Sequence, residues 1–180
     1  MRWLRDILSG RRGGKMAALT KGKQAPEFEL KALDDGRFVL SQELAGRPIV
    51  LAFFKVSCPT CQYAFPFLER LYKTYGGKNV KLVGVSQNDA KDTATFAKQF
   101  GITFPILLED TETYSVSNAY GLTNVPTIFC VAQDGEIELS SVGWIKSDFE
   151  TISRKMAEAG KTSPAPIFKP GEDVRDFRAG

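Results

Sequence analysis

Residues 48–61, PIVLAFFKVSCPTC, decide the fold. Positions 49–56 are almost continuously apolar, as in a central strand that is covered on both faces. A C-x-x-C motif, Cys58 to Cys61, follows directly, and residues 61–75 then repeat apolar side chains at helical spacing. A strand that leads into C-x-x-C and then into a helix is the setting in which a dithiol carries out redox chemistry. We therefore predict a thiol–disulfide exchange centre here.

The spacing of the motif gives its two cysteines different roles. Cys58 falls at the start of the predicted helix, where unpaired backbone N–H groups and the helix dipole stabilise an anion. Pro59 suits the first helical position, where a missing N–H costs nothing. Cys61 lies one turn on, on the apolar stripe, so we expect Cys58 to be the exposed nucleophile and Cys61 the buried resolving thiol. Lys55 is a candidate for lowering the pKa of Cys58, the alternative being an ordinary solvated lysine.

The segments around this motif predict a mixed α/β domain. Strands are expected, in chain order, at 26–31, 38–40, 49–56, 80–85, 104–108, 127–131 and 136–140. Helices are expected at 41–46, 58–75, 89–100, 114–120 and from 147 onward. Asp134-Gly135 is a strong hairpin signal, and Ser147 with Glu150 fits a capping box. The order predicts a three-layer α/β/α sandwich, with an N-terminal β-hairpin and an antiparallel hairpin that closes a parallel sheet.

The composition is that of one globular domain. The chain has 180 residues, 43% of them apolar and 25% charged. We expect this domain at 24–160, after a flexible basic arm at 1–23 and before an extended, proline-containing tail at 161–180. Ile167, Phe168 and Phe177 are the tail residues that would hold it against the domain, a point that the sequence leaves open.

The cysteine and histidine counts limit the chemistry. The chain has three cysteines and no histidine, which excludes histidine acid–base catalysis, Cys–His dyads and histidine metal ligands. Cys130 stands in a predicted strand among apolar residues and reads as a buried small hydrophobe. A zinc site needs four ligands. We therefore predict no metal, and no cofactor besides the Cys58–Cys61 couple itself.

The net charge of +3 belongs to the N-terminal arm. Residues 1–23 hold seven basic residues and one acid, whereas the remainder carries a net charge of −3. A nucleic-acid partner requires a basic face on the fold, and we predict none. The arm has no unbroken apolar core of a secretory signal, and no stretch of the chain is long enough to span a membrane. It is interpreted as a disordered extension or a start site upstream of Met16, in preference to a membrane-surface or partner-binding arm.

Three features in order resemble the thioredoxin-fold superfamily over residues 24–160. Residues 53–61, FFKVSCPTC, resemble the segment from strand to active site, and Pro66 matches the proline within the active-site helix. Residues 118–127, NAYGLTNVPT, resemble the segment that ends in the cis-proline. The additional helix and strand at 87–110 and the opening GKQAPEF at 22–28 resemble the redoxin branch, which includes peroxiredoxins and the membrane-associated thiol–disulfide oxidoreductases of bacterial cytochrome maturation.

The chain departs from these relatives at three places. Ala52 stands where thioredoxins often have a buried acid, and residues 86–88, SQN, stand where the cytochrome-maturation relatives often have a glutamate. The proton of Cys61 therefore has to pass to water, a backbone group or a different acid, or else exchange at Cys61 is slow. The P-x-x-x-T/S-x-x-C pattern of peroxiredoxins precedes neither Cys58 nor Cys61, which counts against a peroxidase.

The resemblance implies a second half of the site. The Val125-Pro126 bond would be cis, and the backbone of Val125 would receive an extended substrate strand by β-addition, with Pro59 and Thr60 beside it. The partners would be a protein disulfide or dithiol substrate and an upstream reductant or oxidant protein. The absence of a signal favours a cytoplasmic reductant, whereas these relatives favour a periplasmic or membrane-associated protein. The alternatives are a peroxide-reducing redoxin and a redox-inactive binding module of the same fold.

Overall fold

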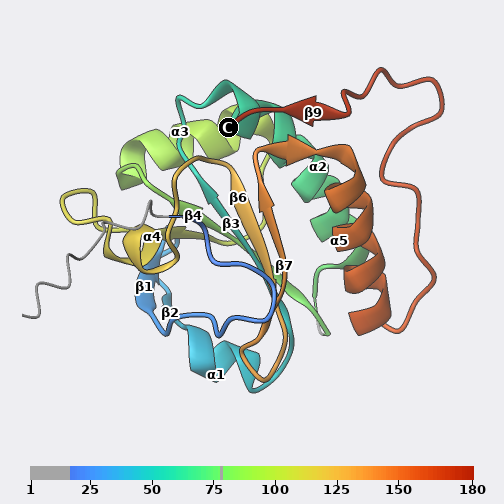
Figure 1. Cartoon of the computed structure of the whole chain (residues 1–180). Helices are drawn as coiled ribbons and strands as arrows, with labels where there is room; N and C mark the ends of the chain where they lie inside the picture. Colours follow the sequence, from blue (N-terminus) through green and yellow to red (C-terminus); the bar gives the residue numbers. More distant parts are fainter. Residues whose placement is uncertain (1–16, 78) are drawn as a thin grey trace, which may run out of the picture.

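A seven-stranded mixed sheet is the centre of the molecule (Figure 1). The computed structural model describes residues 17–77 and 79–180. The strands are β1 Glu29–Ala32, β2 Arg37–Val39, β3 Ile49–Phe54, β4 Lys81–Ser86, β5 Ile106–Leu108, β6 Thr127–Val131 and β7 Ile137–Val142. They lie in the order β2-β1-β5-β4-β3-β6-β7. The β3–β4 and β4–β5 pairs are parallel and all the others are antiparallel.

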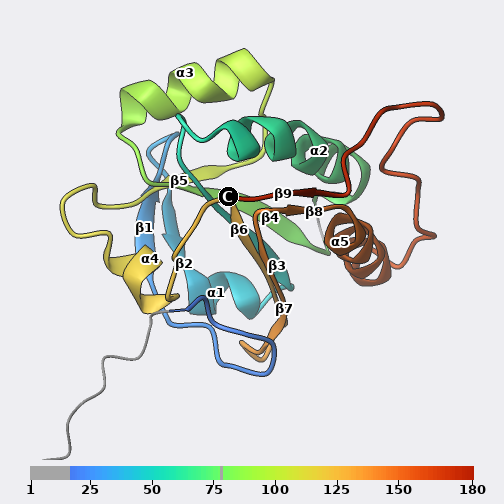
Figure 2. The same cartoon turned by 45° about the horizontal axis from the view of Figure 1, so that its top comes forward.

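Helices cover both faces of this sheet (Figure 2). They are α1 Leu40–Leu44, α2 Pro59–Tyr75, α3 Ala90–Phe100, α4 Ser115–Ala119 and α5 Lys146–Ala159. One apolar cluster joins the sheet to α2, α3 and α5, and the other joins it to α1 and α4. The predicted α/β class and the three-layer sandwich are therefore confirmed.

The central strand β3 connects the two clusters. All six of its residues are buried. Because successive side chains of a strand point to opposite faces, Ile49, Leu51 and Phe53 belong to one cluster and residues 50, 52 and 54 to the other. Its neighbours are β4 and β6. The continuous apolar run thus predicted a strand covered on both faces correctly.

The helix after β3 buries a wider surface than its stripe predicted. Its buried apolar residues are Cys61, Ala64, Phe65, Phe67, Leu68, Leu71 and Tyr75. Phe67 is absent from the stripe predicted by helical spacing, which is Cys61, Ala64, Phe65, Leu68, Leu71, Tyr72 and Tyr75. Its ring packs against Trp144 (centroids 4.8 Å apart) and against Phe168 of the tail (5.5 Å). Pro66 lies inside this helix. The additional burial therefore comes from Trp144 and from the returning tail, neither of which the helical periodicity alone includes.

The start of the last helix differs from the prediction. The helix α5 begins at Lys146, its N-cap is Ile145, and no side chain caps it. The capping box predicted from Ser147 and Glu150 is wrong. The reason is the two-residue strand β8, Trp144–Ile145, which pairs with β9, Phe177–Arg178, and continues directly into the helix. The hydrogen bonds of this pairing, and not a serine side chain, fix where α5 begins.

The segments on either side of the domain make contacts with it. Residues 1–16 of the predicted arm lie outside the described residues. The N–H of Leu19 donates to the Tyr120 carbonyl (3.0 Å), and that of Gly22 to the Ile137 carbonyl (2.8 Å). The tail leaves α5 and returns as β9, which pairs with β8 in a separate two-stranded sheet at the end of the domain where α2 starts (Figure 1). The predicted division at residues 23 and 160 stays a prediction, but the described chain on both sides bonds to the domain. Within the described ranges, no helix combines the length and apolarity needed to cross a membrane.

Candidate active site

Polar residues brace the loop that presents the first cysteine. The chain turns between the end of β3 at Phe54 and the start of α2 at Pro59. In this turn the Asn88 side-chain oxygen accepts a hydrogen bond from the N–H of Val56 (3.0 Å). The Gln62 side-chain amide donates to the Val56 carbonyl (2.9 Å). These bonds join the turn to the end of β4 and to α2, so that they fix the position of Cys58.

Cys58 and Cys61 form a reduced dithiol at the first turn of α2. Both are free cysteines, and Cys58 is half-buried whereas Cys61 is fully buried. Cys58 is the N-cap residue of the helix, and its sulfur accepts a hydrogen bond from the N–H of Cys61 at 3.1 Å. The difference in exposure agrees with the predicted roles of an accessible and a buried thiol.

The surroundings shift the pKa values of the two thiols in opposite directions. They lower the pKa of Cys58 to about 6. The largest cause is the hydrogen bond from the Cys61 side chain, and backbone N–H groups and the charge of Arg178 act in the same direction against partial burial. The pKa of Cys61 is raised, because burial disfavours its thiolate. At neutral pH the pair therefore holds a thiolate on Cys58 and a proton on Cys61.

The second half of the site lies directly against the first. The Val125-Pro126 peptide bond is cis. The Cys58 sulfur lies 3.2 Å from the Val125 carbonyl oxygen, across a sequence separation of 67 residues, and donates a hydrogen bond to it when the thiol is protonated. In the same loop the Thr127 hydroxyl donates to the Asn124 carbonyl (2.7 Å). The fold thus brings the C-x-x-C motif and the cis-proline loop into contact, as the resemblance implied.

The remaining predicted site residues differ in their surroundings. Pro59 is exposed, whereas Thr60 is buried beside the dithiol. Lys55 is exposed, and its ammonium group lies 5.7 Å from the centre of the Tyr114 ring. The cation whose charge contributes to the lowered pKa of Cys58 is Arg178. The roles of Pro59 and Thr60 in substrate binding, and of Lys55 as a pKa modulator, stay predictions.

The C-terminal residues also reach the dithiol, which the sequence did not predict. The Thr60 hydroxyl donates to the Ala179 carbonyl (2.6 Å), and the Asn124 side-chain amide donates to the Gly180 carbonyl (3.2 Å). The guanidinium of Arg178 lies 5.0 Å from the centre of the Tyr63 ring. No motif marks these residues, because their position depends on the path of the whole tail.

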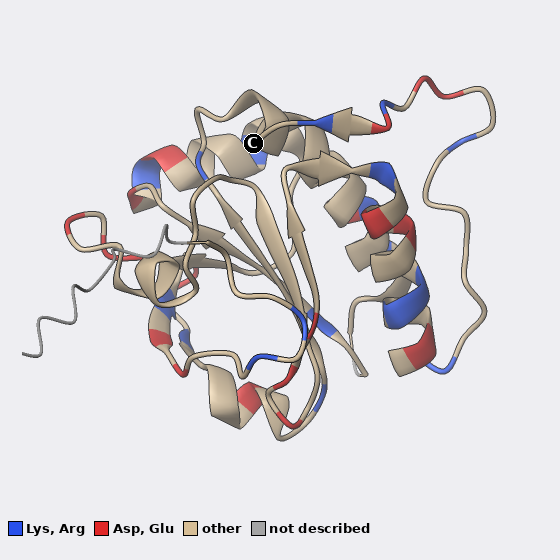
Figure 3. Ribbon diagram, viewed as in Figure 1, with Lys and Arg blue, Asp and Glu red and all other residues tan. Residues whose placement is uncertain are grey.

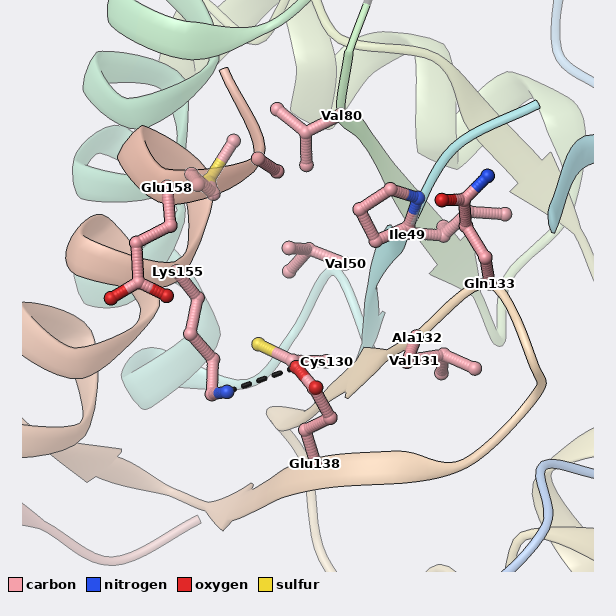
Figure 4. Close-up of a pocket in the computed structure, with 13 residues that line it drawn as sticks. Ile49, Val50, Val80, Cys130, Val131, Ala132, Gln133, Glu138, Lys155 and Glu158 are labelled. Atoms are coloured by element: carbon pink, nitrogen blue, oxygen red, sulfur yellow. Dashed lines mark hydrogen bonds and ion pairs between the residues drawn. The ribbon is translucent and has the colours of Figure 1, made fainter. Parts of the chain in front are cut away.

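The third cysteine lies in a separate pocket (Figure 4). Cys130 lines a cavity of about 240 Å³ between α5 and the sheet, and its sulfur points into it. Lys155 and Glu138 form an ion pair at this pocket with an N–O distance of 2.9 Å. Burial raises the pKa of the Cys130 thiol to about 12. The prediction that Cys130 is a buried apolar residue is confirmed.

Buried carboxylates are engaged away from the dithiol. Glu69 accepts hydrogen bonds from the N–H groups of Thr103 (2.8 Å) and Phe104 (3.4 Å). Glu109 accepts from the N–H and the hydroxyl of Ser117, both at 2.5 Å. No carboxylate of residues 17–77 or 79–180 hydrogen-bonds to Cys61. The sequence offers no acid at Ala52 or Gln87, and in the described chain no other acid is in hydrogen-bond contact with Cys61.

Charges of both signs are distributed together over the described fold (Figure 3). Basic and acidic residues occur together along α5 and along α3. In the part of the chain that the structure describes, no three or more potential metal ligands come together. The absence of a nucleic-acid partner and of a metal stays a prediction.

A dithiol at a helix start, a lowered pKa at its first cysteine and a cis-proline beside it define a thiol–disulfide oxidoreductase of the thioredoxin fold. The chain belongs to the AhpC/TSA family: its residues 21–140 match the sequence model of that family. It is 31% identical over 141 residues to the thiol-disulfide oxidoreductase ResA of Geobacillus thermodenitrificans, with 75% of this chain and 79% of the relative covered. It is also 32% identical over 117 residues to ResA of Halalkalibacterium halodurans. That alignment covers 64% of this chain and 65% of the relative, so it spans just under two thirds of the relative's length.

Solved structures agree with this classification. A thiol:disulfide interchange protein of the thioredoxin family from Chlorobium tepidum superposes with a TM-score of 0.63 at 26% identity, over 77% of this chain and 99% of that one. The thioredoxin domain of a thiol-disulfide oxidoreductase from Bacteroides vulgatus gives a TM-score of 0.68 at 20% identity, over 77% and 98%. The second likeness concerns the fold alone. The predicted redoxin branch and the predicted oxidoreductase class are confirmed.

Proposed function

We propose that Cys58 is the nucleophile and Cys61 the resolving thiol in the reduction of a disulfide bond of a protein substrate. The Cys58 thiolate attacks one substrate sulfur and forms a mixed disulfide, and the other substrate sulfur leaves and takes up a proton. The Cys61 thiol then loses its proton and attacks the Cys58 sulfur. A Cys58–Cys61 disulfide forms, the second substrate thiol is released, and two electrons have passed to the substrate.

One observation carries this proposal: the two thiols share one helical turn and hold their protons differently. The N–H of Cys61 lies 3.1 Å from the Cys58 sulfur, and the pKa of Cys58 is lowered to about 6 while that of Cys61 is raised. The thiolate is the attacking species in exchange. Cys58 therefore begins the reaction, and Cys61 attacks only after the mixed disulfide has removed the negative charge from Cys58.

The surroundings of Cys61 support water as its proton acceptor. Cys61 is fully buried in the reduced state, and the described carboxylates bond elsewhere. Cys58, one turn away, is half-buried and open to solvent. In this proposal the second step is slower than the first, because the proton of Cys61 leaves a dry environment without a positioned base.

The direction of electron flow and the partner proteins follow from the reduction potential of the couple. A potential near about −270 mV fits a reductant that an upstream dithiol protein regenerates, and one near about −120 mV fits an oxidant. A cytoplasmic location fits the first value, and an exported or membrane-associated location fits the second. Equilibration of the Cys58–Cys61 couple with glutathione buffers measures this potential and separates the two cases.

The test of the proposed roles is the reduction of insulin coupled to dithiothreitol. The unaltered protein is expected to accelerate insulin reduction, and Cys58→Ser to bring the rate to that of dithiothreitol alone. The matched control is Cys130→Ser, which removes a thiol from the remote pocket and is expected to keep the activity. Retention of activity by Cys58→Ser would contradict the assignment of the nucleophile.

A further inference from the structure

The tail is held against the domain up to the point where it reaches the active site. The Arg70 guanidinium makes two hydrogen bonds to the Glu172 carboxylate (2.8 and 2.7 Å). The indole N–H of Trp144 donates to the Arg175 carbonyl at 2.6 Å, and the N–H of Arg175 donates to the Tyr63 hydroxyl at 3.1 Å. These bonds at 172 and 175 determine where the following residues, 176–180, can lie.

Residues 177–180, which we call the strap, cross between the C-x-x-C helix and the cis-proline loop (Figures 1 and 2). The first two pair antiparallel with β8, and the last two bond to the site from both sides. The Ala179 carbonyl accepts from Thr60, and the Gly180 carbonyl accepts from Asn124. A Cβ atom at Gly180 would lie only 2.5 Å from the Val125 carbonyl oxygen. The strap therefore touches the same Val125 carbonyl that faces the Cys58 sulfur.

The strap is attached by its backbone and not by buried side chains. Phe177 is 62% exposed, the largest exposed apolar side chain among the described residues, and residues 179 and 180 are exposed as well. Its attachments are two β-pairs, two hydrogen bonds to side chains and the contact of the partly exposed Arg178 guanidinium with the Tyr63 ring. A segment with few buried apolar contacts opens at a low free energy. The strap is therefore a part of the fold that another extended chain can replace.

We propose that the strap occupies the substrate groove of its own chain, and that a protein substrate binds by displacing it and pairing with the edge of β8. This inference rests on the proposed function, since the groove is the one beside Cys58. An extended substrate offers the same backbone carbonyls to Thr60 and Asn124 as the strap does. The strap thus competes with protein substrates, and it selects those with an accessible extended segment over compact ones.

Two variants test this competition at the kinetic level. One lacks residues 177–180, and the other is Gly180→Val, whose side chain clashes with the Val125 carbonyl and pushes the strap out while it keeps Arg178. Both are expected to lower the KM for insulin by about 3- to 10-fold, because an intramolecular competitor is removed. The control Ser163→Val, at an exposed tail position far from the strap in sequence, is expected to leave the KM within about 2-fold. An unchanged or raised KM in both strap variants would overturn the proposal.

Two measurements keep this inference separate from the proposed catalytic roles. The first is alkylation of Cys58 by iodoacetamide at pH 8.5, where its thiolate is fully formed, and it is expected to be faster in both strap variants. The second is calorimetric binding of the peptide DVRDFRAG, the sequence of 173–180, to the variant without residues 177–180 in a Cys58→Ser background. Binding of this peptide, but not of a scrambled peptide, supports the groove even if insulin reduction fails. The proposal is rejected if the peptide does not bind and the alkylation rate of Cys58 is unchanged in both strap variants.

Discussion

Cys58 and Cys130 lie at opposite ends of one sheet, and the same side chain has opposite properties at the two places. Cys58 follows the carboxyl end of β3, where its pKa falls to about 6. Cys130 pairs with Val50 near the start of β3, where burial raises its pKa to about 12. Phe54 lies four residue steps after Val50 in β3, a distance on the order of 13 Å at strand geometry. Disulfide formation needs Cα atoms within about 7 Å, so Cys130 lies outside the reach of Cys58.

The difference shows that hydrogen-bond donors can outweigh partial burial at Cys58, whereas burial dominates at Cys130. Cys58 is itself partly buried, yet the Cys61 side chain and the first N–H groups of α2 outweigh that penalty. Cys130 has a cation nearby, Lys155, which lowers its pKa, but Glu138 pairs with this cation and acts against it. A helix start supplies several donors that no neighbouring anion cancels. This is why the position in the helix, and not the strand before it, makes the redox centre.

The largest expected effect on this comparison comes from Cys61→Ser. The variant keeps the nucleophile but has no resolving thiol, so the mixed disulfide between Cys58 and the substrate accumulates. We expect turnover in the insulin assay to fall by at least about 100-fold, since an intramolecular attack is replaced by attack from external thiol. Non-reducing electrophoresis with mass spectrometry measures the trapped adduct. The same experiment on Cys130→Ser should show full turnover and no adduct.

The contrary result would be an adduct at Cys61 in the Cys58→Ser variant. If it formed as fast as the adduct at Cys58 in Cys61→Ser, the two thiols would not differ in reactivity. It would mean that the buried thiol attacks substrates directly. In that case the opposite pKa shifts of the two thiols would not determine the order of attack.

The second effect is the pH dependence of alkylation in the reduced protein. The folded pKa of Cys58 is about 6, below the usual thiol value of about 8.5. Its thiolate therefore forms as the pH rises through about 6, and at pH 7 its thiolate fraction exceeds that of an ordinary thiol by about 30-fold. We expect iodoacetamide labelling of Cys58 to have its midpoint near pH 6. Labelling of Cys130 should be absent below pH 9, as peptide mass spectrometry can show.

If the labelling of Cys58 had its midpoint near pH 8.5, Cys58 would behave as an ordinary thiol and its predicted difference from Cys130 in pKa would be smaller. The variant Arg178→Ala sharpens the measurement. Because the charge of Arg178 is the smallest of the named causes of the lowered pKa, its loss should move the midpoint upward by less than one pH unit.

The elements that local patterns determine could be predicted from the sequence. The apolar run of β3, the stripe of α2 and the turn at Asp134-Gly135 each carry their own signal, and the structure has them at those places. The resemblance of residues 118–127 to the cis-proline segment located the second half of the site. Burial of Cys61 and partial exposure of Cys58 followed from one turn of helix.

The part that could not be predicted depends on long-range contacts of the tail. The start of α5 was expected from a capping box, but pairing of β8 with β9 sets it. Burial of Phe67 and the contact of Ala179 with Thr60 come from the same returning tail. Residues 161–180 contain no strong periodic pattern, and backbone hydrogen bonds over a separation of more than 30 residues leave no local signal. The sequence therefore predicted the dithiol but did not predict that residues 177–180 lie beside it.

The smallest expected effect is the loss of folding stability when Cys130 is substituted. Cys130→Ala removes a buried sulfur and should lower the free energy of unfolding by about 1 kcal/mol, which corresponds to a Tm lower by about 2–4 °C for a chain of this size. Cys130→Ser should lower the free energy of unfolding more, because its hydroxyl is buried where the cysteine packs among Val50 and other apolar residues of the core. Both variants should reduce insulin at the rate of the unaltered protein, because the pocket lies at the other end of the sheet. A large loss of activity without a loss of stability, measured by thermal unfolding beside the assay, would show that the two ends are coupled.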